Sequence, residues 1–314
     1  MRDYVEELER QLIVAAQTGM GRTHVARRLR LIRSAAVTVA VSVAVAAVVV
    51  LETSTGGLGL SNASAAAVLR STADAALVHA DPFPAARQFF YARWKLNILT
   101  PIEQSSPRQK SSLSSEARVS VVVSVRWSPT RPGVIRRRVL GVTFPTAAAR
   151  ERWQALGRPA LAETAPSTIL PASGDDVQIG NRLLTPRELL SLPRQPARLY
   201  LRLFAKTSAI DALELVSRLD VYPIGGGLRA ALYRALARVQ GVRLAGKVRT
   251  LSGRAGEAVS ARIPHSFGEQ YELIVDVADG ALLGYRAVAT ESRNGIPAGT
   301  VLSESDLVGR GISN

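Results

Sequence analysis

The run SAAVTVAVSVAVAAVVVL, residues 34–51, decides how the chain is organised, because it contains no charged residue. As a helix rising about 1.5 Å per residue it would be about 27 Å long, close to the hydrocarbon thickness of a bilayer. Arg30 and Arg33 stand directly before the run, whereas Glu52 and a Ser/Thr/Gly segment follow it. The sequence therefore predicts one transmembrane helix, with the N-terminus in the cytoplasm and the rest of the chain outside.

This span divides the chain into four parts: a cytoplasmic tail (1–33), the transmembrane helix (34–51), a linker (52–61) and an extracytoplasmic domain (62–314). The predicted location is the cell membrane, with a single pass. A cleaved signal peptide is one alternative, since Ala63-Ser64-Ala65 resembles a cleavage site. The long segment before the run and the length of the run itself favour a retained anchor. A buried core helix is a further alternative, and it would be shorter or amphipathic.

The cytoplasmic tail contains a short amphipathic pattern. Tyr4, Val5, Leu8 and Leu12 recur at helical spacing, with acidic residues near the start of the helix. Such a helix could bind a cytoplasmic regulator, or it could be a solvated helix beside the membrane. The pattern leaves both open.

The chain is strongly basic and lacks cysteine. Its formal net charge is +15 over 314 residues, and most of its cations are arginines. The missing cysteines exclude disulfides, thiolate metal sites and a cysteine nucleophile. A basic domain outside a membrane favours anionic lipid headgroups or an anionic envelope polymer as partners, and the predicted topology excludes nucleic acid. The alternative is that the arginines lie on solvated faces and bind no ligand.

The outer domain is predicted to be α+β, with a curved antiparallel sheet packed by helices. Apolar residues at helical spacing predict helices at about 61–80, 147–156, 186–192, 197–207, 210–219 and 228–239. Val-rich and aromatic runs predict strands at about 88–99, 118–127, 134–144, 242–251, 257–263, 271–277 and 281–290. Short turns separate the last four strands, which predicts an antiparallel meander.

The sequence contains little that suggests catalysis. Of its three histidines, His24 falls in the cytoplasmic tail and only His79 and His265 fall outside. An extracytoplasmic hydrolase using His265, with Ser266 and Asp276 nearby, is the enzymatic alternative, but no GxSxG turn accompanies it. Neither zinc-ligand spacing nor a cofactor motif is present. We therefore expect no catalytic, metal or cofactor site, and no enzyme.

Aromatic residues on two predicted strands are the candidate ligand-binding residues. Phe89, Tyr91 and Trp94 lie on the first strand and Trp127 ends the second. They could line an apolar cavity for an acyl chain, with nearby arginines binding an anionic headgroup. The alternative is that these rings fill the core.

Four segments resemble one family: LLTPRELLSLPRQPARLYLRL (183–203), LRAALYRALARVQGVRLAGKVRTLSGRAGEAVS (228–260), ELIVDVADGALLGYRAV (272–288) and IPAGTVLSESDLVGRGI (296–312). It is an uncharacterised family of actinobacterial-type single-pass membrane proteins, often encoded beside extracytoplasmic-function sigma factors. The outer domain also resembles the half-barrel fold of lipoprotein carriers. This resemblance implies a link to envelope-stress signalling.

These patterns together predict a membrane-anchored binding or sensing module at the cell envelope, for an apolar or anionic lipid-like ligand. Two alternatives stay open, namely the hydrolase using His265 and a structural envelope protein that binds no ligand.

Overall fold

The computed structural model describes residues 60–79, 83–85, 87–102, 115–128, 133–161, 169–172, 177–179, 182–184, 186–219, 222–262, 268–292 and 295–313. The predicted cytoplasmic tail and the apolar run 34–51 lie outside these residues, so the transmembrane anchor stays a prediction. Among the helices of the described ranges, none is both long enough and apolar enough to cross a bilayer.

Nine strands within the described residues form one antiparallel sheet in the order β4-β3-β2-β1-β11-β10-β9-β8-β7. The strands are β1 (Phe89–Pro101), β2 (Glu116–Trp127), β3 (Gly133–Thr143), β4 (Ile169–Ala172), β7 (Arg243–Arg249), β8 (Ala255–Arg262), β9 (Glu269–Val275), β10 (Leu282–Ala289) and β11 (Val301–Ser313). A separate hairpin pairs β5 (Val177–Ile179) with β6 (Arg182–Leu184). The predicted α+β class with a large antiparallel sheet is confirmed.

One face of the sheet is apolar, and we call it the core face. On β2 every second residue from Ala117 to Trp127 is buried, because side chains alternate across a strand. Trp127 on this face contacts the ring of Tyr222 edge-on at 6.3 Å between centroids. On β9, the Tyr271 hydroxyl lies 3.1 Å from the hydroxyl of Ser217 on helix α7 (Ala209–Leu219). These contacts join the core face to α7 and to Tyr222 in the loop that follows it.

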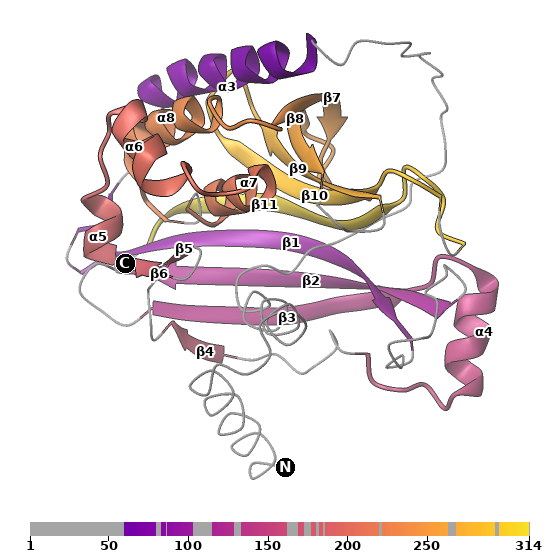
Figure 1. Ribbon diagram of the computed structural model, residues 1–314. Coiled ribbons are helices and arrows are strands. Elements are labelled where there is room, and N and C mark those ends of the chain that lie inside the picture. Colours follow the sequence, from indigo (N-terminus) through magenta and orange to yellow (C-terminus); the bar gives the residue numbers. More distant parts are fainter. Residues whose placement is uncertain are drawn as a thin grey trace, which may run out of the picture. The chain divides into compact units, whose positions relative to one another are not determined.

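Helices α3, α6, α7 and α8 lie together on one side of the sheet (Figure 1). The helices are α3 (Leu60–Val78), α4 (Ala147–Ala155), α5 (Pro186–Leu190), α6 (Pro196–Leu203), α7 (Ala209–Leu219) and α8 (Gly225–Leu236). α8 packs against both α3 and α6, and α7 packs on β8 and β9. α4 agrees with its predicted range, and the Thr146 side chain caps it by accepting from the Ala149 N–H at 3.1 Å.

β11 lies in the centre of the sheet, between β1 and β10. The sequence patterns do not predict this strand, nor β4, β5 and β6, which fall in segments expected to be loops or left unassigned. β11 carries Glu304, Ser305 and Asp306 as three consecutive buried residues. A run of polar residues hides a strand from any search for apolar alternation. The predicted meander is therefore only part of the sheet.

Two glycines permit close packing around the predicted β9–β10 hairpin. Gly280 in its turn has a φ of 71°, and a Cβ there would collide with the backbone nitrogen of Ala76 on α3. Gly284 on β10 leaves no space for a Cβ against the carbonyl oxygen of Ser305 on β11. The turn thus docks directly on α3, and β10 lies close against β11.

Candidate binding surface on the polar face of the sheet

The four aromatic residues predicted to line a cavity lie on two different faces of the sheet. Trp94 and Trp127 are on the core face, where each is 5 % exposed or less. Trp94 lies 6.2 Å from the ring of Tyr285, measured between centroids. Phe89 and Tyr91 alternate with Trp94 along β1 and therefore lie on the opposite face, which we call the polar face. The structure does not gather the four rings in one place.

On the polar face, Phe89 lies beside an arginine and Tyr91 lies beside a glycine. The Arg126 guanidinium stands 4.4 Å from the centroid of the Phe89 ring, within the range of a cation–π contact. Tyr91 is 38 % exposed, and its ring lies against Gly311 of β11, where a Cβ would come within 3.2 Å. Contact of any of the four aromatic residues with a ligand stays a prediction.

The histidines form no visible catalytic or metal site in the described part of the chain. His79 is exposed at the end of α3, with its Nδ1 3.3 Å from the carbonyl oxygen of Ala75. His265 lies outside the described residues, so the hydrolase alternative stays a prediction. The described ranges contain no cluster of His, Asp and Glu that could hold a metal ion.

Four cations on the polar face flank a line of short side chains. Arg93 and Lys95 on β1 are the register partners of Ser124 and Val122 on β2. On the other side of β2, Ser124 is the register partner of Arg136 and Val122 that of Arg138, both on β3. Directly paired residues of antiparallel strands point to the same face. We call the set Arg93, Lys95, Arg136, Arg138, Val122 and Ser124 the cationic strip.

The cations of the strip reach solvent. Arg93, Arg136 and Arg138 are exposed and Lys95 is half-buried. Within the described residues, none of the four has a carboxylate at ion-pair distance. Along β3, Arg136 and Arg138 are exposed and Arg137 between them is half-buried. Within the described ranges, cations that meet no carboxylate therefore stand on both sides of Val122 and Ser124.

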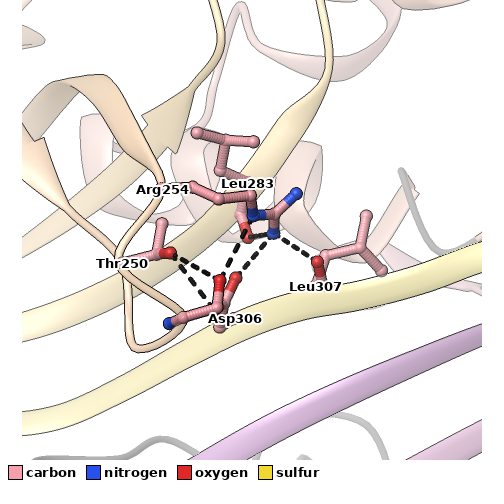
Figure 2. A network of polar contacts seen from close by, with 6 residues as sticks. Thr250, Arg254, Leu283, Asp306 and Leu307 are labelled. Atoms are coloured by element: carbon pink, nitrogen blue, oxygen red, sulfur yellow. Dashed lines mark hydrogen bonds and ion pairs between the residues drawn. The ribbon is translucent and has the colours of Figure 1, made fainter.

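Asp306 on β11 is the register partner of Lys95, one of the cations of the strip. Its carboxylate, however, already has other partners. It is completely buried and accepts hydrogen bonds from the Thr250 hydroxyl at 3.1 Å and from the Ser252 N–H at 2.7 Å. The Arg254 guanidinium forms an ion pair with it at 2.6 Å and also donates to the carbonyl oxygen of Leu307. Figure 2 shows Thr250 and Arg254 converging on this carboxylate.

The partners of Asp306 come from the turn between β7 and β8, although β9 and β10 separate those strands from β11. The turn must therefore fold over the polar face to reach β11. Beneath it, a small apolar cluster of Ala258, Ile274 and Leu283, with Val248 packed against it, is buried. Gly256 allows this approach, because a Cβ there would lie 2.8 Å from the Leu283 side chain. This half of the polar face is thus closed by the chain itself.

A polar row continues across the same half of the sheet. Glu304 on β11 is the register partner of Asn97 on β1 and of Arg286 on β10. Arg286 Nε donates to Glu272 Oε2 at 2.5 Å. Burial raises the pKa of Glu304 to about 7, against the opposing effect of Arg286. The pKa of Arg118 is lowered, also by burial.

Neither a family model nor a curated protein matches this sequence. Among solved structures, one similar to it is MucB in complex with MucA(peri), at 11% identity and a TM-score of 0.28. Another is the Pseudomonas aeruginosa MucA/MucB complex, at 12% identity and a TM-score of 0.24. Both alignments cover 80% of this chain, which spans 56% and 58% of those chains. A likeness this low assigns no function to this chain.

Sequence reasoning missed the cationic strip, although its signal is present. Arg93 and Lys95 are two residues apart, as are Arg136 and Arg138, and short residues alternate along 120–124 between them. Two-residue spacing places each pair on one face of a strand. The pairing of β1 and β3 on either side of β2 was the missing information.

Proposed function

We propose that this chain is a non-catalytic binding module of the cell envelope that holds an extended polyanion along the cationic strip. The observation that carries the proposal is the set of four cations without carboxylate partners among the described residues, arranged on both sides of β2. Carboxylates or phosphates would supply the missing charge, and arginine binds both well.

The geometry favours an extended ligand over a compact one. Neighbouring strands lie about 4.8 Å apart, so the cations of β1 and β3 are separated by about 10 Å across β2. Along each strand the two cations are about 7 Å apart, since two residues advance the chain by that distance. Ser124 and Val122 form a low floor between them. In a phosphodiester chain lying along β2, one phosphate would lie between Arg93 and Arg136, and the next would lie between Lys95 and Arg138.

The location of the module follows from the apolar run 34–51, which we propose is a retained anchor with the domain outside the cytoplasm. In that location a polyanion of the envelope is the available partner, and nucleic acid is not. The half-barrel form of the fold, the link to envelope-stress signalling and a cytoplasmic regulator at the N-terminal helix rest on the sequence patterns and the resemblance alone.

The test is equilibrium binding of poly(glycerol phosphate) to the full chain, purified from the membrane fraction in neutral detergent. The variant Arg93→Gln/Lys95→Gln/Arg136→Gln/Arg138→Gln removes the strip. We expect its affinity to fall by about tenfold to a hundredfold, since each of the four exposed ion pairs that it loses contributes about 0.4 to 0.7 kcal/mol. Recovery of the chain from the soluble fraction would contradict the anchor.

A matched control separates the strip from the net charge. The variant Arg70→Gln/Arg150→Gln/Arg238→Gln/Lys247→Gln removes the same number of arginines and lysines from exposed positions elsewhere. It should bind the polymer like the unmodified chain at equal ionic strength. Equal losses in both variants would show that only the overall charge of the protein attracts the polymer.

A further inference from the structure

α6 carries a large apolar side chain in solvent, beside arginines. Leu201 is 71% exposed, the second most exposed of the large apolar side chains described. Arg198 and Arg202 are exposed on the same side of the helix, with Ala197 one turn before Leu201. Arg194 is exposed just before the helix begins. We call Arg194, Ala197, Arg198, Leu201 and Arg202 the α6 ridge.

The exposure of Leu201 is imposed by the packing of the helix. Leu199 and Leu203 are buried, as is Phe204 directly after the helix, and α6 packs against α8. With these three side chains inside, the helical period of 3.6 residues directs Leu201 outward. Leu190 on α5, the preceding helix along the chain, is also exposed, at 40%. Two leucines are thus held in solvent by a well-packed scaffold.

The segment that carries the ridge has charge of a single sign. The segment 194–206, RQPARLYLRLFAK, contains no acidic residue, and Lys206 at its end is also exposed. Among the described residues, Arg194, Arg198 and Arg202 have no ion-pair partner. The ridge therefore combines an outward leucine with cations that meet no carboxylate in the part of the chain that the structure describes.

We propose that the α6 ridge docks on an anionic lipid surface. Leu201 enters the boundary between headgroups and acyl chains, while Arg198 and Arg202 extend along it and bind lipid phosphates. Basic residues close to an anionic leaflet each strengthen binding about fivefold. A predicted anchor in the same chain would keep the ridge near the bilayer, so that weak contacts suffice.

This inference does not depend on the cationic strip, and it adds an orientation to the proposed function. α6 belongs to the helix layer on the core-face side, whereas the strip lies on the polar face (Figure 1). A domain resting on the bilayer through α6 leaves the strip uncovered by lipid. The polyanion would then be held on the side away from the helices.

The test uses the full chain in vesicles, with an environment-sensitive dye on the single thiol of Ala197→Cys, since the chain has no cysteine of its own. Vesicles of phosphatidylcholine are compared with vesicles that also contain phosphatidylglycerol. We expect a blue shift of the dye only with the anionic lipid. Leu201→Asp should abolish it, and Arg198→Gln/Arg202→Gln should weaken docking by about 25-fold, fivefold for each arginine.

Two controls make the result specific. A dye on Ala148→Cys, exposed on α4, should not respond to phosphatidylglycerol, and Arg150→Gln/Arg238→Gln should leave the Ala197→Cys signal unchanged. A dye at Ala197→Cys that ignores lipid charge overturns the proposal. A shift that follows the protein-to-lipid ratio instead would assign the ridge to a second copy of the chain, and also overturns it. Binding of poly(glycerol phosphate) is measured on the same ridge variants. If they bind the polymer normally while the dye ignores lipid charge, the docking proposal fails and the proposed function of the strip does not.

Discussion

The two halves of the polar face handle charge in opposite ways. On β1 and β3, four cations flank short side chains of β2, and among the described residues none of them meets a carboxylate. On β9 to β11, Arg286 pairs with Glu272, and Arg254 reaches from the β7–β8 turn to the buried Asp306. Both halves are rich in arginine, but within the described ranges Arg254 and Arg286 meet carboxylates and the cations of the strip do not. Pairing therefore separates the proposed binding surface from the structural half, and charge density alone does not.

The largest expected effect comes from removing the carboxylate of the paired half. Asp306→Asn keeps the shape of the side chain but leaves Arg254 and two other donors without their charged acceptor. Loss of one member of a buried pair costs about 3 to 5 kcal/mol. We expect the free energy of unfolding to decrease by an amount near the lower end of this range, because the Arg254 side chain is 44% exposed. Urea denaturation of the full chain in detergent measures it.

The control for this substitution is Asp74→Asn, which breaks the exposed ion pair between Asp74 and Arg234. An exposed pair contributes at most about 1 kcal/mol, so this variant should unfold close to the unmodified chain. If both substitutions lower the free energy of unfolding equally, Asp306 does not stabilise the β9–β11 half of the polar face. The contrast between the two halves would then be wrong.

A smaller and pH-dependent effect is expected at Glu304. Its raised pKa of about 7, against 4.5 ordinarily, means that the folded state binds the proton more tightly than the unfolded state. The contribution of Glu304 to stability therefore falls as the pH rises from 4.5 to 7, by about 3 kcal/mol at most. Glu304→Gln cannot ionise, so it should gain stability relative to the unmodified chain across this range.

The measurement is the difference in unfolding free energy between Glu304→Gln and the unmodified chain at pH 5 and at pH 8. The difference should be larger at pH 8, because only the unmodified chain then carries the buried charge. Parallel pH profiles would show that Glu304 is solvated in the folded state, and that the paired half is less closed than its burial indicates.

The sequence was sufficient for the elements whose stability is local. α4 follows from the Thr146 cap, and α7 and the β9–β10 hairpin follow from apolar spacing and the ADG turn. It was insufficient for β11, because Glu304 and Asp306 are buried through partners distant in the chain, such as Arg254. The same long-range pairing explains the site. Arg93 and Arg136 become neighbours across Ser124 only when β1 and β3 join opposite edges of β2.

The most direct test of the central claim is the position of a bound polyanion on the strip. Ser124→Cys places the only thiol of the chain on the floor between Arg93 and Arg136. Saturating poly(glycerol phosphate) should slow alkylation of this thiol by iodoacetamide, and should leave alkylation of Ala148→Cys on α4 unchanged. Bound polymer with no protection of the Ser124→Cys thiol would contradict the account.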